Sequence, residues 1–157
     1  MINIETQQDF SDTALLERAA RFTLDASASL STGSESAPAD VDMTIVLTDD
    51  AQLHKLNHEY LGVDAPTDVL SFPASETDPE TGTPYLGDIL ISVPRAMQQA
   101  QSAGHSVEDE VQLLVVHGTL HLLGHDHAEA QEKACMWKAQ AEVMSRLGLS
   151  HVKIQDT

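Results

Sequence analysis

The chain has 157 residues, of which 41% are hydrophobic, so it is long enough to form one globular domain with a sizeable core. Its 25 acidic and 8 basic residues give a net charge of −17, which argues against a nucleic-acid-binding surface built from Lys and Arg. No run approaches the roughly 20 apolar residues of a membrane span, and the first residues do not resemble a signal peptide. The single cysteine, Cys135, excludes an internal disulfide, so we expect a cytoplasmic protein with no membrane partner.

Hydrophobic periodicity along the chain predicts alternating short strands and amphipathic helices. The order β-α-β-α-β-β-α-α-α predicts an α+β fold, in which a small mixed four-stranded sheet packs against a layer of about five helices. Residues 1–157 are expected to form a single domain. The expected strands are 2–5, 43–48, 67–72 and 86–93; the expected helices begin at Ser11 or Asp12, at Asp49 or Asp50, at Pro94, at Ser106 and at Asp126; polar loops are expected at 31–41 and 73–84.

Three of these helices have apolar patterns that predict which face is buried. The helix after Ser106 is apolar nearly all round, so we expect it to be central and buried. In the first helix, which ends near Leu30, the expected buried residues are Leu15, Ala19, Phe22, Ala26 and Leu30; in the last, which ends near Leu147, they are Ala130, Ala134, Trp137, Ala141 and Met144.

The stretch HGTLHLLGHDH, from His117 to His127, predicts a metal site. His117 and His121 are four residues apart, so their side chains share one face of a helix. Gly124 can adopt the left-handed conformation that ends a helix, which lets the chain bring His127 to the same point. Three imidazoles without a fourth protein ligand are typical of a catalytic zinc site with one open position, although imidazole also suits nickel, copper or iron. We expect His125 to be a surface loop residue.

The same histidine spacing occurs in metzincin proteases, which carry a glutamate as general base directly after the first histidine. Here that position is Gly118, so a protease of that class would lack its base. The base for a hydrolytic reaction would instead be Asp126 or a carboxylate elsewhere. Asp126 has a second interpretation, because an aspartate there, three residues before Glu129, also suits the start of the last helix.

The motif resembles the signature H-G-x-L-H-L-x-G-x-D-H of the YbeY family of bacterial zinc-dependent rRNA maturation endoribonucleases. Residues 56–73 (LNHEYLGVDAPTDVLSFP) and 86–91 (LGDILI) are similar to two further segments of that family, so the resemblance covers roughly residues 43–147. It implies one Zn²⁺ per chain, held by the three motif histidines, and a single-stranded RNA substrate. It also implies a part in 16S rRNA 3′-end maturation and ribosome quality control, with the small ribosomal subunit or its associated proteins as partners and no role for DNA.

One position departs from the family pattern, because Leu61 stands where the family usually has an arginine that is taken to contact RNA. A leucine cannot bind phosphate as an arginine does. Arg95 is the nearest substitute that the sequence offers, and Thr67, Asp68 and Ser71 are expected to line the substrate cleft. Two alternatives stay open: a non-catalytic zinc protein that docks on the ribosome, and a metalloprotease-like hydrolase. The sequence also leaves open whether water or the RNA 2′-hydroxyl is the nucleophile.

Overall fold

The computed structural model describes residues 2–8, 10, 12–30, 41–77, 79, 82–125 and 129–152. Within these residues, four strands form one mixed sheet in the order β1-β2-β4-β3, with β1–β2 and β2–β4 parallel and β3–β4 antiparallel. The predicted α+β fold, a four-stranded mixed sheet with five helices, is therefore confirmed. The elements are β1 (Ile2–Thr6), α1 (Ala14–Leu30), β2 (Asp42–Thr48), α2 (Asp50–Leu61), β3 (Val69–Thr77), β4 (Pro84–Ser92), α3 (Val93–Ala103), α4 (Val107–Leu122) and α5 (Ala130–Arg146).

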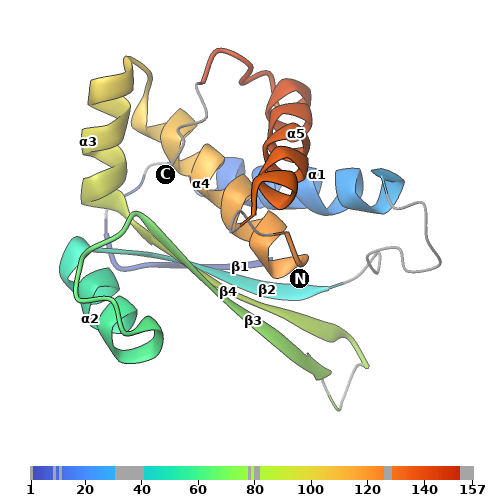
Figure 1. Cartoon of the computed structure of the whole chain (residues 1–157), viewed down its shortest axis with the longest axis horizontal. Coiled ribbons are helices and arrows are strands. Elements are labelled where there is room, and N and C mark those ends of the chain that lie inside the picture. The colour runs from blue at the N-terminus through green and yellow to red at the C-terminus, as the bar shows by residue number, and fades with distance from the viewer. Residues whose placement is uncertain are drawn as a thin grey trace.

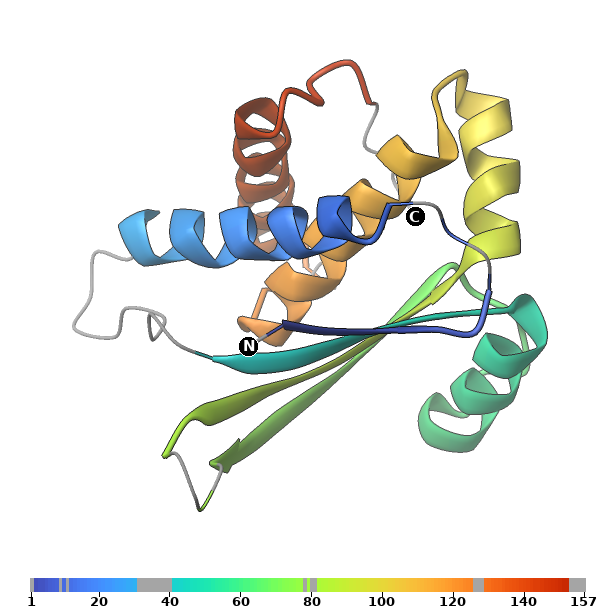
Figure 2. The same cartoon turned by 180° about the vertical axis from the view of Figure 1, so that it is seen from behind.

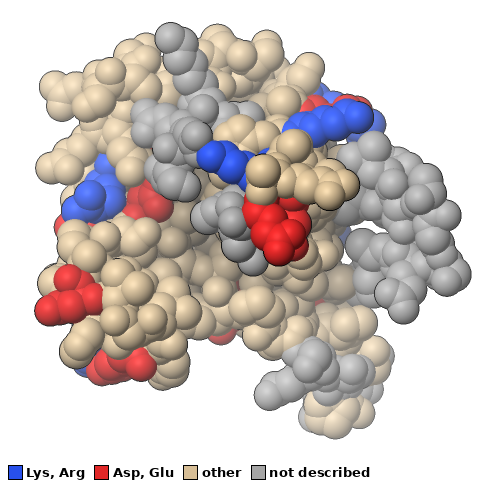
Figure 3. Space-filling model, viewed as in Figure 1, with Lys and Arg blue, Asp and Glu red and all other residues tan. Residues whose placement is uncertain are grey.

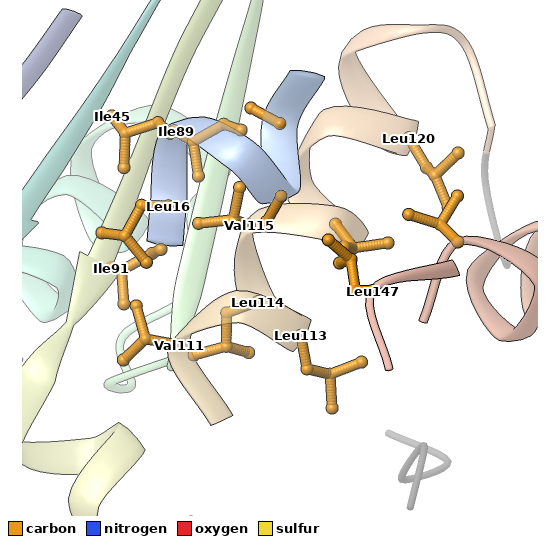
Figure 4. Close-up of a cluster of buried hydrophobic side chains, with 14 of the residues drawn as sticks. Leu16, Ile45, Ile89, Ile91, Val111, Leu113, Leu114, Val115, Leu120 and Leu147 are labelled. Atoms are coloured by element: carbon orange, nitrogen blue, oxygen red, sulfur yellow. The ribbon is translucent and has the colours of Figure 1, made fainter. Parts of the chain in front are cut away.

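Four of the helices, α1, α3, α4 and α5, form a layer on one side of the sheet, and α2 lies apart from them on the other side (Figures 1 and 2). Helix α4 lies in the middle of the layer, where it contacts α1, α3, α5, β3 and β4. The hydrophobic core fills the space between α4 and the sheet (Figure 4). Ile89 and Ile91 of β4 point toward Val111 and Val115 of α4 there. No helix in the described part of the chain combines the length and apolarity that crossing a membrane requires.

Helix α4 has the boundaries that the sequence predicts. At its start, the Ser106 side chain accepts a hydrogen bond from the Asp109 backbone N–H at 3.1 Å, as expected of a helix cap. At its end, Gly124 has φ 100° and its N–H bonds to the carbonyl oxygen of His121, while the N–H of His125 bonds to that of Leu120. This pair of bonds is the Schellman pattern, so the predicted turn at Gly124 is confirmed.

Strand β3 is longer than predicted. The expected loop at 73–84 is wrong for its first part, because β3 continues to Thr77 and pairs with β4 as far as Pro84. Proline breaks a central strand because it has no N–H to donate, but β3 is an edge strand of the described sheet and tolerates Pro73. The strand pairing is irregular between Pro73 and Glu76. Its start at Val69 places Thr67 and Asp68 just before the strand.

The predicted buried faces of α1 and α5 are right at Ala19, Ala26 and Met144, which are buried, and wrong at several other positions. In α1, Leu16 is fully buried and Leu15 only partly. In α5, Ala134 and Ala141 are exposed, and the buried residues are Met136, Ala139, Gln140, Val143 and Met144. The predicted face was drawn from the spacing of alanines with Trp137 and Met144, and that pattern does not include Gln140. Helix α5 begins at Ala130 with Glu129 as its N-cap and without a side-chain cap bond, which is later than predicted; the predicted cap, Asp126, lies outside the described residues.

Helices α2 and α3 start at the same end of the sheet and are joined there by an ion pair. Arg95 donates from Nε to Asp50 Oδ1 at 2.7 Å and from Nη2 to Asp50 Oδ2 at 2.9 Å. Ser92, the N-cap of α3, donates to the same carboxylate at 3.4 Å. The hydrogen bond from Arg95 is the main cause that lowers the pKa of Asp50 below 3.8. The ion pair therefore links the two helices most strongly when Asp50 is ionised.

Asp50→Asn tests this link through its pH dependence. Because the pKa of Asp50 is lower in the folded protein, its stabilisation is present above pH 3.8 and is lost as the pH falls through the folded pKa. We expect the wild type to exceed Asp50→Asn in free energy of unfolding by no more than about 1 kcal/mol near neutral pH, since the pair is partly exposed. Urea unfolding should show this gap narrowing below pH 3.8; a gap that stays constant there would contradict the assignment.

Candidate metal centre

The imidazoles of His117 and His121 face one another on α4. Their Nε2 atoms are 3.1 Å apart, and their ring centroids are 4.7 Å apart with the planes at 76°. Two nitrogens that bind one tetrahedral zinc at about 2.0–2.1 Å lie about 3.4 Å from each other. The observed pair therefore fits two ligands of a single zinc ion after a small adjustment. The two side chains therefore converge, as their spacing in the sequence predicts.

The third predicted ligand, His127, lies outside the described residues. Among the residues that are described, no group of three or more His, Cys, Asp or Glu side chains is placed to hold a metal ion. The assignment of His127 therefore stays a prediction, and the test of fit depends on the His117–His121 pair alone.

Two residues of α5 hold the ring of His117. The Nδ1 atom of His117 lies 2.6 Å from Oε1 of Gln140, and the indole of Trp137 meets the imidazole edge-on at 6.0 Å between centroids. Neither residue was predicted as part of the site. The signal that could have revealed Gln140 is its place in the repeat of Met136, Val143 and Leu147, where it shares the buried face of the helix.

An open pocket of about 600 Å³ lies over the two histidines. It is bounded by the end of α4, by β3 and the residues before it, and by Leu61 at the end of α2. Thr67, Asp68 and Ser71, which the sequence predicts as substrate-binding residues, all line this pocket with His117 and His121. Their assignment to substrate stays a prediction, but the structure brings them to the histidine pair.

Arg95 is not among the residues that line the pocket. Its guanidinium is engaged with Asp50, and that hydrogen bond is the main cause that raises its pKa. The negative charge of Asp68 raises the pKa of Arg95 further, which indicates that Arg95 lies close enough to the pocket to act on it through charge. The predicted direct contact between Arg95 and substrate is untested.

His125 also lines the pocket, and its side chain is only partly exposed. The expectation that it is a loop residue agrees with its place after the end of α4, and the structure adds that it faces the pocket. The cause is the turn at Gly124, which bonds the His125 N–H back to Leu120 and so returns the chain toward the end of α4.

Gly118 occupies the position where a metzincin would carry its glutamate, and the structure explains the difference. A Cβ atom added to Gly118 would lie 2.9 Å from Cγ2 of Ile89 in β4, which is closer than carbon atoms can pack. The position therefore faces the sheet, away from the pocket, and cannot present a carboxylate to a metal. The edge strand β3 also holds α4 at this position, because the Ser71 hydroxyl donates a hydrogen bond to the Gly118 carbonyl at 3.3 Å.

The surface around the site has few positive charges. Figure 3 shows no large patch of Lys and Arg on the face that it presents; the blue side chains are scattered among red ones. None of the residues described as lining the pocket is Lys or Arg. Leu61 is 60% exposed at the rim, with Tyr60 and Val63 beside it at 67% and 48%. The rim is therefore apolar where the family pattern has an arginine.

Comparisons with known proteins agree with the motif. The family model described as Endoribonuclease YbeY matches residues 2–148. A protein with that name from Pelotomaculum thermopropionicum is 43% identical over 141 residues, which cover 88% of this chain and 88% of that protein. Another from Desulfitobacterium hafniense is 51% identical over 121 residues, which cover 73% of this chain and 76% of that protein. The solution structure of TM1509 from Thermotoga maritima has a similar fold, with a TM-score of 0.58, 25% identity and coverage of 99% of this chain and 97% of that one.

Gly118→Ala tests the close packing of α4 on β4. Replacing glycine with alanine inside a helix normally stabilises it by about 1 kcal/mol. Here we expect destabilisation by about 1–3 kcal/mol, because the new methyl overlaps Ile89. Urea unfolding of Gly118→Ala, Ile89→Ala and the double variant measures the coupling. The alanine should cost less in the Ile89→Ala background; equal costs in both backgrounds would show that Ile89 is not the obstacle.

The single tryptophan of the chain provides a reporter of metal binding at this pair. Because Trp137 lies 6.0 Å from the ring of His117, a bound Co²⁺ ion should quench its fluorescence, and a chelator should restore it. Titration of the wild type with Co²⁺ should give saturable quenching that His121→Ala abolishes. Quenching of equal size and midpoint in His121→Ala would place the metal elsewhere.

Proposed function

The chain belongs to the endoribonuclease YbeY family, and from this premise we propose that it is a zinc-dependent endoribonuclease specific for single-stranded RNA. Its proposed role is in the 3′-end maturation of 16S rRNA and in ribosome quality control, in the cytoplasm, with the small ribosomal subunit or its associated proteins as partners. The observation that carries the proposal is the pair of imidazole nitrogens 3.1 Å apart beneath an open pocket.

The proposed metal ligands are His117, His121 and His127. A zinc ion held by these residues would supply a Lewis acid for a phosphoryl oxygen of the RNA. A bond from Nδ1–H of His117 to Gln140 leaves the lone pair of Nε2 directed at the ion, which is the protonation state that metal binding needs. The His117–His121 pair is therefore suited to zinc in its nitrogen ligands and its spacing, and His117 also in its tautomer.

The other residues of the pocket are proposed to bind and orient the RNA. Thr67 presents a hydroxyl group that can contact a phosphate or a ribose. Ser71 donates its proton to the Gly118 carbonyl, so its hydroxyl oxygen can accept a hydrogen bond from a ribose hydroxyl. Asp126 is the proposed general base, since Gly118 cannot supply one. Arg95 is proposed to help by charge, because it lies near enough to Asp68 to offset part of its repulsion of phosphate.

An RNA cleavage assay with purified zinc-loaded protein tests the proposal. The substrates are a single-stranded RNA from the 3′ end of 16S rRNA and the same RNA annealed to its complement. We expect cleavage of the single strand, little cleavage of the duplex, and background cleavage of both by His121→Ala. His151→Ala is the matched control, because His151 is an exposed histidine bonded to Asp109 and does not line the pocket.

The outcomes separate the proposal from its rivals. Equal cleavage by wild type and His121→Ala would show contamination and overturn the nuclease assignment. Zinc and RNA binding without cleavage would support a non-catalytic ribosome-associated protein, which the apolar rim at Leu61 favours. Chelator-sensitive peptide cleavage would support the metalloprotease-like alternative. The RNA end groups decide the nucleophile, since attack by the 2′-hydroxyl leaves a 2′,3′-cyclic phosphate.

A further inference from the structure

Helix α5 contributes a buried side chain to the histidine pair, and its role extends the proposed function, on which this inference rests. We propose that Gln140 is the positioning residue of the metal centre: it holds His117 in the metal-binding tautomer, and because it is uncharged it preserves the positive charge that the site offers to phosphate. The juxtaposition that supports this is the 2.6 Å contact between Gln140 Oε1 and His117 Nδ1.

The chemistry of the contact determines where the proton lies. An amide oxygen accepts hydrogen bonds and cannot donate them, so Nδ1 of His117 must carry the proton in this bond. A neutral imidazole with its proton on Nδ1 has its lone pair on Nε2, and it is Nε2 of His117 that lies 3.1 Å from Nε2 of His121. Gln140 thus selects the tautomer and sets the rotation of the ring that a metal ion at this pair requires.

Burial makes this contact rigid. Gln140 is 1% exposed and lies between Met136 and Val143 on the face of α5 that packs into the core. A buried amide without a hydrogen-bond partner is costly, so the bond to His117 is strongly favoured over rotamers that break it. Trp137 contacts the same imidazole from one turn earlier in α5, which restricts the ring from a second direction. The position of α5 against α4 therefore determines the geometry of the pair.

The lack of charge on Gln140 matters because so little else near the pocket attracts an anion. The chain carries a net charge of −17, no Lys or Arg is among the residues described as lining the pocket, and Asp68 adds a negative charge there. Carboxylates commonly accept the second N–H of a metal-binding histidine, and they raise the basicity of the ligand. A carboxylate in place of Gln140 would make His117 bind the metal ion more tightly, but its negative charge would also cancel part of the positive charge of the ion. An amide orients the ring without that loss.

The test uses two variants at the position and one control. Gln140→Leu removes the acceptor, Gln140→Glu restores it with a charge, and Gln112→Leu removes another buried glutamine, one that bonds only to the Glu108 carbonyl in the described contacts. Zinc affinity is measured by competition with a chromophoric chelator. Anion affinity is measured with inorganic phosphate, from the change in the absorption spectrum of the Co²⁺-loaded protein. Circular dichroism and urea unfolding verify that each variant is folded.

The expected pattern has opposite signs for the two variants. Gln140→Leu should weaken zinc binding by about 10–100-fold, the usual effect of losing the partner of a histidine ligand. Gln140→Glu should bind zinc at least as tightly as the wild type, yet bind phosphate more weakly by on the order of tenfold, as expected of one added negative charge several ångström away. Gln112→Leu should match the wild type in both measurements.

The contrary results are equally distinct. If Gln140→Leu and Gln140→Glu weaken zinc binding alike while folded, or if Gln140→Leu binds zinc like the wild type, the residue only fills space and the inference is overturned. If Gln140→Glu does not fold, the result for folded Gln140→Leu decides. If the wild type itself binds no zinc, the proposed metal centre fails and this inference fails with it. That failure is seen in the wild type, whereas failure of the inference alone is seen only in the variants.

Discussion

The close contact between α4 and β4 is the constraint on which the site depends. Gly118 lies so near Ile89 that no side chain fits between the helix and the sheet. This contact sets the rotation of α4 about its axis, and with it the direction of the adjacent face of the helix, which carries His117 and His121. A larger residue at position 118 would separate the helix from the sheet and shift both imidazoles. The missing metzincin glutamate is thus a consequence of packing as well as a difference in chemistry.

The features that follow from local sequence could be predicted. The spacing of His117 and His121 places them on one helical face whatever surrounds the helix, and Gly124 ends that helix because of its own backbone freedom. The individual strands and helices follow from hydrophobic periodicity in the same way. These predictions held because each depends on residues close together in the chain.

The features that depend on distant contacts could not be predicted from local patterns. Gln140 shows no local sign of its role until α5 is packed against His117, and the apolar pattern that predicted the buried face of α5 did not include it. Pro73 resembles the end of a strand until β3 is known to lie at the edge of the sheet. That the loop residue His125 lines a pocket could not be predicted, because β3 and Leu61, which bound that pocket, are far away in sequence.

The acidity of the chain and its membership of an endoribonuclease family are compatible if attraction of RNA is concentrated at one point. With a rim that is apolar at Leu61 and a pocket lined in part by Asp68, the divalent ion would be the main positive charge that a phosphate meets. An uncharged partner for His117 fits that distribution.

The most direct test of the account is zinc K-edge X-ray absorption of the protein loaded with one equivalent of zinc. The account predicts nitrogen and oxygen neighbours at about 2.0–2.1 Å with the outer-shell scattering of imidazole rings, and no sulfur neighbour. A sulfur neighbour at about 2.3 Å, which only Cys135 or a methionine could supply, would contradict it. A spectrum without imidazole scattering would contradict it as well.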